Sequence, residues 1–195
     1  MNYAMSSLKA DFDELRERIR HGRELGHAGF EPIYYLIFNP ADIIEVKRLT
    51  PAWIAKLRNE GWAVSAFSIA EAIENILSND PRRPLWLMAQ KKTPHDWEKT
   101  NQALANALIS NGALQKRLEE AIFAMEGNKN GLVLVTDLEA LHPYMRIGTI
   151  ESSLQSNFHV PTIFLYPGKR TGKTGLKFLG FYPEDGNYRS VHVGG

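Results

Sequence analysis

The chain has 195 residues, 44% of them hydrophobic and 23% charged, which is typical of a folded globular protein and excludes a largely disordered one. The 23 basic and 22 acidic residues nearly cancel, whereas a general nucleic-acid binder usually carries a clear basic excess. Cysteine is absent, which excludes disulfides, cysteine nucleophiles and thiolate metal sites. Residues 1–23 contain no apolar run of signal-peptide length, and no later run approaches the roughly 18 residues of a membrane span. We therefore expect a soluble, cytoplasmic protein with a single domain over residues 1–195.

Helical and strand patterns alternate from the N-terminus onward. An apolar stripe at helical spacing predicts a core-packing amphipathic helix through Leu8, Phe12, Leu15 and Ile19. Residues 33–38 are an uninterrupted run of apolar, mostly aromatic and β-branched side chains, which predicts a strand buried on both faces. A helix is expected from about residue 42. We expect it to restart at Thr50 and Pro51, because proline suits the first helical position.

The same alternation continues to the C-terminus. Apolar runs predict further strands at residues 62–67, 84–88, 131–137 and 161–166. Helices are expected at residues 70–77, behind a capping pattern of Ser68 and Glu71, from Thr93 onward with breaks at Gly112 and Gly127, and around 147–155. This order predicts an α/β fold with three layers, in which helices flank a mostly parallel sheet. Residues 176–182 and 188–193 are expected to form a C-terminal antiparallel hairpin at one edge.

A glycine-rich basic segment, residues 168–174, resembles a phosphate-binding loop only in part. The nucleotide-binding motif has four residues between its glycines and leads into a helix, whereas three residues separate Gly168 from Gly172 and a strand pattern follows. We therefore favour a solvated basic hairpin loop, with Lys169, Arg170 and Lys173 as candidate contacts for an acidic partner.

Asp137 ends the clearest buried strand and is the first carboxylate to test, because ligands of open parallel sheets bind at strand ends. The simpler reading is that Asp137 caps the segment after it. His142 is the second candidate near this strand end. The six histidines are otherwise scattered, none pairs at metal-ligand spacing, and no serine lies in a nucleophile-elbow pattern. We expect no catalytic residue, metal or cofactor.

Three of the four tryptophans have a predicted role. Trp62, Trp86 and Tyr34 lie within apolar runs, and core burial explains them best. Trp97 follows a helix start beside three lysines, which makes this corner a candidate for contact with a protein or nucleic acid: Lys91, Lys92 and Lys99.

Several blocks of the chain resemble the BrxB family of BREX phage-defence proteins. They are residues 141–146 (LHPYMR), 161–168 (PTIFLYPG), and 176–180 (LKFLG) with 187–189 (NYR), and residues 34–40 resemble the first strand of that family. The resemblance implies a small accessory subunit, encoded beside an ATPase, a methyltransferase and the alkaline-phosphatase-like PglZ. It implies protein–protein association, with PglZ as the first partner and any DNA contact indirect or weak. It supplies no catalytic residues.

The residues in these blocks also have physical interpretations. Arg146 is expected to pair with Asp137 or Glu139, and residues 166–168 (Tyr-Pro-Gly) to fix the exit from a strand. Tyr188 and Arg189 are further candidate partner contacts, since an arginine can bind a carboxylate with two parallel hydrogen bonds.

Three functions follow for comparison. The first is an assembly subunit. The second is a degenerate nucleotide hydrolase that uses Asp137 with Lys173. The third is a weak nucleic-acid-binding module that uses Lys169, Arg170 and Lys173 with the Lys91 corner, and its binding would weaken steeply with salt.

Overall fold

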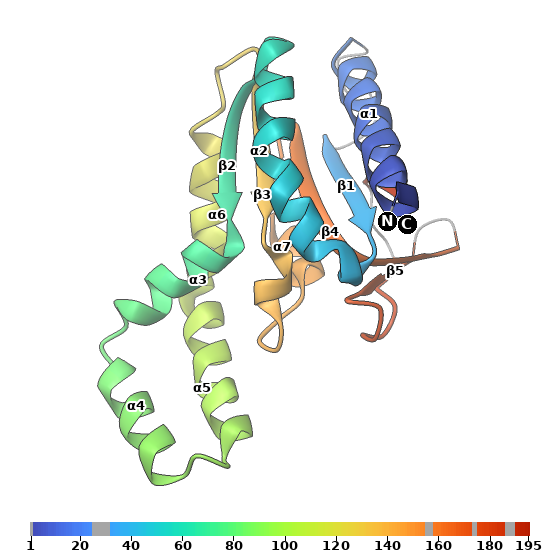
Figure 1. Cartoon of the computed structure of the whole chain (residues 1–195). Helices are drawn as coiled ribbons and strands as arrows, with labels where there is room; N and C mark the ends of the chain where they lie inside the picture. The colour runs from blue at the N-terminus through green and yellow to red at the C-terminus, as the bar shows by residue number, and fades with distance from the viewer. Residues whose placement is uncertain (1, 25–31, 155–157, 173–174, 186–189) are drawn as a thin grey trace.

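The computed structural model describes residues 2–24, 32–154, 158–172, 175–185 and 190–195, in which helices flank a six-stranded sheet (Figure 1). The strands are β1 (Ile33–Phe38), β2 (Ala63–Ser68), β3 (Gly131–Thr136), β4 (Thr162–Thr171), β5 (Gly175–Phe178) and β6 (Val191–Gly194). The helices are α1 (Asn2–Glu24), α2 (Ile43–Asn59), α3 (Ile69–Ser78), α4 (Arg83–Lys92), α5 (Trp97–Ile109), α6 (Ala113–Phe123) and α7 (Ile147–Ser153). Short 3-10 turns are η1 (Pro40–Asp42), η2 (Ser110–Gly112) and η3 (Leu138–Leu141).

The sheet is mostly parallel, which confirms the predicted fold class. Its order is β2-β3-β4-β1-β6, and all neighbours on this path run parallel. The antiparallel hairpin is formed by β4 and β5, because β4 extends beyond β1 and pairs with β5 from Gly168 to Thr171. The expectation that residues 188–193 complete an antiparallel hairpin is wrong, since β6 adds to the far side of β1 in parallel. Apolar alternation has the same period in both ladder types, so it carried no signal for direction.

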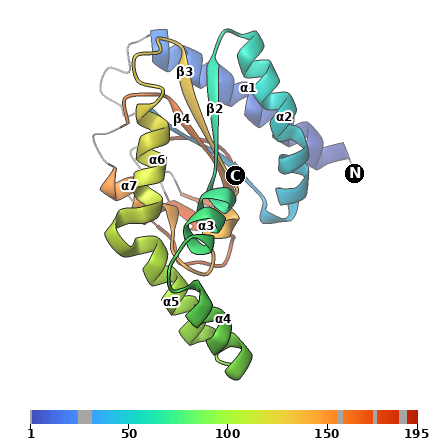
Figure 2. The ribbon, with the colours of Figure 1, turned by 90° about the vertical axis from the view of Figure 1, so that its left-hand side faces the viewer.

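Two apolar layers form the core, one on each face of the sheet. Because successive strand residues point to opposite faces, Tyr35 of β1 packs with α3, α6 and α7, whereas Leu36 packs with α1 and α2. Figure 2 shows these two groups of helices on opposite sides of the strands. Both faces are covered, which explains why β1 and β3 consist almost entirely of apolar residues.

The helices α1 and α2 cover one face together. The predicted stripe of α1 is buried, and Phe12 stacks on Trp53 of α2 with 4.6 Å between ring centroids. The predicted restart at Thr50 and Pro51 is wrong, because α2 runs through Pro51 without a break. An internal proline costs a helix about 3 kcal/mol. Burial of Val46, Trp53 and Leu57 on the same helix offsets that cost.

The predicted strand at residues 84–88 is also wrong. These residues lie in α4, with Pro84 in its first turn, and none of the ten residues of α4 is buried. Trp86, which we expected in the core, is half-buried beneath the Arg82 guanidinium, 5.5 Å from its ring centroid. By contrast, Trp62 and Tyr34 are buried as predicted. The Ser68 cap is confirmed as well, because its Oγ accepts a hydrogen bond from the Glu71 amide at 3.2 Å.

None of the helices described above is both long and apolar enough to cross a lipid bilayer.

Candidate functional site

Asp137 lies at the carboxyl edge of the parallel sheet, immediately after β3. Its Oδ2 accepts hydrogen bonds from Ser68 Oγ at the end of β2 and from Thr136 Oγ1, both at 2.7 Å. Lys47 Nζ, from the first turns of α2, lies 2.7 Å from Asp137 Oδ1 and 2.7 Å from Glu139 Oε1 of η3. Lys47 therefore crosses the edge of the sheet and links the helix on one face to the 3-10 turn on the other.

These contacts determine the charge state of the network. Burial raises the pKa of Asp137, but the hydrogen bonds from Lys47, Ser68 and Thr136 lower it by more. The net pKa of Asp137 is therefore below its usual value. For Lys47, burial lowers the pKa, and the two carboxylates raise it by more. The pair is thus ionised at neutral pH, with the Asp137 carboxylate occupied by donors from its own chain.

The expectation that the Asp137 side chain caps the next segment is wrong. Asp137 precedes η3, but its side chain accepts no capping hydrogen bond there, because its oxygens face Ser68, Thr136 and Lys47 instead. Its backbone adopts the left-handed region, with φ of 59°. Aspartate tolerates this conformation better than most residues do.

A second cluster joins η3 and α7 to the segment after β5. Arg146 Nη1 donates to Asp185 Oδ1 at 3.0 Å, and the guanidinium lies 5.1 Å from the ring centroid of Tyr182. The predicted pairing of Arg146 with Asp137 or Glu139 is therefore wrong, since Lys47 occupies both carboxylates. His142 Nδ1 contacts the hydroxyl of the same Tyr182. Arg146 and His142 thus hold the C-terminal segment against the body of the protein.

The β4–β5 hairpin presents a basic edge. Lys169 and Arg170 are exposed, and Lys169 is paired directly across the ladder with Lys177. Like charges in this position repel each other, so an acidic group from outside the hairpin would be stabilising. The segment leads into β5 and not into a helix, so it lacks the helix N-terminus of a nucleotide-binding loop. Lys173, Tyr188 and Arg189 lie outside the described residues.

Residues 166–168 do not end β4, contrary to our expectation, because the strand continues to Thr171. At Gly168 a Cβ would lie 2.4 Å from Tyr166 Cε1 and 2.5 Å from the Lys177 carbonyl oxygen. We expect Gly168→Ala to lower the free energy of unfolding by about 1–3 kcal/mol, the usual cost of overpacking. Urea denaturation measures it, with Lys169→Ala as a control in the same hairpin. Equal stability of the two variants would show that the hairpin adjusts freely.

An arm formed by α4 and α5 extends away from the sheet (Figures 1 and 2). The predicted contact corner lies on this arm, where Trp97 begins α5 and is 67% exposed. Its lysines are exposed as well, and contact with a partner there stays a prediction: Lys91, Lys92 and Lys99. The exposed apolar side chains of α4 were not predicted, because residues 84–88 were expected to form a buried strand. A signal was present nonetheless: Pro84 suits a first helical turn, and residues 84–88 contain no β-branched side chain.

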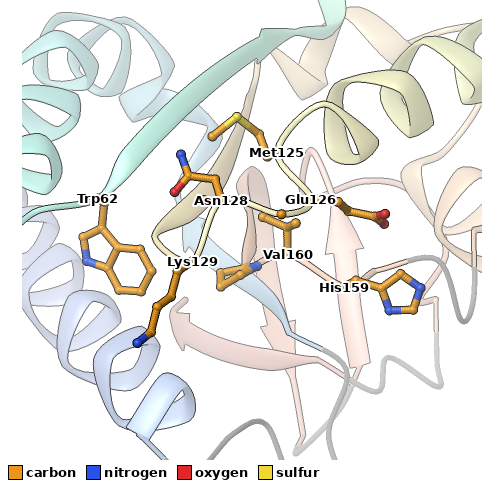
Figure 3. Close-up of a pocket in the computed structure, with 10 residues that line it drawn as sticks. Trp62, Met125, Glu126, Asn128, Lys129, His159 and Val160 are labelled. Atoms are coloured by element: carbon orange, nitrogen blue, oxygen red, sulfur yellow. The ribbon is translucent and has the colours of Figure 1, made fainter.

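A pocket of about 340 Å³ lies at the opposite edge of the sheet, where β3 begins. Figure 3 shows Trp62 and Lys129 on one side of it and Glu126 and His159 on the other. Lys129 and His159 are exposed to solvent. Within the described part of the chain, no three His, Asp or Glu side chains gather closely enough to hold a metal ion.

Comparison with known proteins identifies the family. The family model described as BREX protein BrxB matches residues 67–193, about two thirds of the chain. The matched region runs from the end of β2 to β6 and therefore contains the arm, the Asp137 edge and the basic hairpin. Searches of curated proteins and of solved structures each found no match. The chain belongs to the BrxB family and is thus associated with BREX phage defence.

Proposed function

We propose that this chain is a non-catalytic assembly subunit of a BREX-type anti-phage complex and acts by binding other BREX proteins, with PglZ as its first partner. Family membership supports the BREX context. The observation that carries the assembly role is the occupied carboxyl edge of the sheet. Ligands of open α/β sheets bind at this edge, and here Lys47, Ser68 and Thr136 already bind the Asp137 carboxylate.

The basic hairpin supports contact with an acidic protein surface. Lys169 and Arg170 are exposed, and Lys177 lies opposite Lys169. The near-neutral net charge of +1 gives no general attraction to DNA, so a local acidic patch on a protein is the better complement. PglZ is proposed from the family resemblance.

Co-purification tests the assembly role directly. Tagged protein, expressed with the neighbouring BREX genes, is expected to bring down PglZ in a fixed ratio, and deletion of its gene is expected to abolish phage defence. Recovery without any BREX subunit, together with intact defence in the deletion strain, would reject the proposal.

The variant Asp137→Asn separates assembly from catalysis. It keeps the shape of the side chain and removes its charge, so an enzyme that depends on this carboxylate would lose activity while remaining assembled. We expect Asp137→Asn to support defence at temperatures where it stays folded, as judged by circular dichroism. Loss of defence in a folded variant that still binds PglZ would contradict the non-catalytic role.

A further inference from the structure

We propose that the α4–α5 arm inserts into an apolar groove, rimmed by carboxylates, on another BREX subunit. This inference rests on the proposed function and assigns the surface that performs it. The first observation is the topology. The arm lies in the connection between β2 and β3, which are adjacent parallel strands, and a single crossover helix suffices for such a connection. The fold therefore does not require α4, whereas α5 packs Leu108 into the core.

The second observation is the exposure of α4. None of its residues is buried, and three large apolar side chains are between 47% and 61% exposed: Leu85, Leu87 and Met88. Leu85 and Met88 are three residues apart and share one side of the helix, whereas Leu87 lies on a different side. A flat partner surface would cover only one of these sides. A groove that receives the helix covers both, as in other helix-in-groove complexes.

The third observation is charge. The helix α4 contains Arg83, Lys91 and Lys92 and no acidic residue. Arg82 at its start is already occupied, because it binds Asp80 at 2.7 Å and covers Trp86. The two lysines in the last turn favour carboxylates at the rim of the groove. A second copy of α4 would present the same positive charges and no acidic residue, so we propose a different protein as the partner.

A nucleic acid is the other candidate occupant, since Trp97 is exposed near Lys91 and Lys92. Phosphate contacts would use the lysines but would leave Leu85, Leu87 and Met88 in water. The apolar sides of α4 therefore favour a protein groove.

The test uses the full chain and PglZ obtained by co-expression of the BREX genes. Because α4 buries no residue, we expect Leu85→Glu/Met88→Glu to keep the melting temperature of the wild type. We expect the same variant to raise the Kd for PglZ-containing complexes by about 100-fold. Lys91→Glu/Lys92→Glu is expected to weaken binding by about tenfold at low salt and by less at high salt. The matched controls are Phe123→Glu, at a position 70% exposed, and Lys116→Glu/Arg117→Glu, both on α6. They should stay within about twofold of the wild type.

The outcomes separate the two proposals. If the wild type binds BREX subunits and both arm variants bind equally well, the arm assignment is wrong and the assembly role stands. If the wild type binds none of them, the assembly role itself fails. Two further results would also overturn the arm assignment: a homodimer that Leu85→Glu/Met88→Glu disrupts, or a single-stranded oligonucleotide that competes with PglZ and depends on Lys91 and Lys92. Biolayer interferometry measures binding to PglZ, light scattering detects a homodimer, and fluorescence anisotropy detects a bound oligonucleotide.

Discussion

Replacing Phe164 by alanine is expected to lower the free energy of unfolding by about 3–5 kcal/mol, a large part of the stability of an ordinary domain. Phe164 is fully buried in β4, which lies between β3 and β1. Its ring stacks on Tyr35 with 5.1 Å between centroids and meets Phe158 edge-on at 6.4 Å. Truncation removes both ring contacts and leaves a cavity that the covered sheet cannot easily close. Urea denaturation measures the loss, and the melting temperature should fall by roughly 10 °C.

Phe123→Ala provides the matched control. It removes the same ring from a position at the end of α6 that is 70% exposed. We expect a change within about 0.5 kcal/mol, as for most surface substitutions. Similar losses in the two variants would mean that β4 does not occupy the centre of the core.

The second large effect is expected at the carboxyl edge of the sheet. Asp137→Ala should lower the free energy of unfolding by about 2–3 kcal/mol at neutral pH, because it leaves the Ser68 and Thr136 hydroxyls without their acceptor and removes one carboxylate from Lys47. Lys47 retains Glu139, which limits the loss. The half-exposed lysine is screened by solvent, so its share is the smaller one. Asp137→Asn should lose less than Asp137→Ala.

The contribution of the Asp137 charge to the free energy of unfolding should depend on pH. Because the pKa of Asp137 is lowered on folding, its charge contributes stability that is fully present above the unfolded value, near 3.8, and is lost as the pH falls through the folded pKa. The stability gap between the wild type and Asp137→Asn should therefore be largest at neutral pH and shrink below about pH 4. Urea midpoints at several pH values test it. A gap that widens on acidification would show that the carboxylate is protonated more readily in the folded protein.

The sequence predicted the strands of the sheet correctly where a long apolar run was compatible only with a buried strand. Residues 33–38 and 131–135 are continuous apolar runs, and such runs become strands when both faces of a sheet are covered. Residues 84–88 are a shorter apolar run that begins with proline and lacks β-branched side chains, and they form an exposed helix. Short apolar runs do not distinguish a strand from a helix, and exposure depends on where the chain projects from the fold.

The site was less predictable, because its contacts join distant parts of the chain. Asp137 was identified from its place after a strand, but its partner Lys47 lies in α2 and is brought to it only by the strand order. Arg146 was expected to pair with Asp137 or Glu139, which are close to it in the sequence, but it pairs with Asp185. The sequence identifies which side chains carry charge, and the topology decides which of them form ion pairs.

The position of β1 also has a consequence for production of the protein. Six apolar residues of β1 (Ile33–Phe38) leave the ribosome long before β4, their main partner, which begins at Thr162. Until then this run is an exposed apolar segment of high β-propensity that carries no charge, and such segments promote aggregation. Yield of native protein should therefore improve with slower translation, lower growth temperature or added chaperones that bind nascent chains.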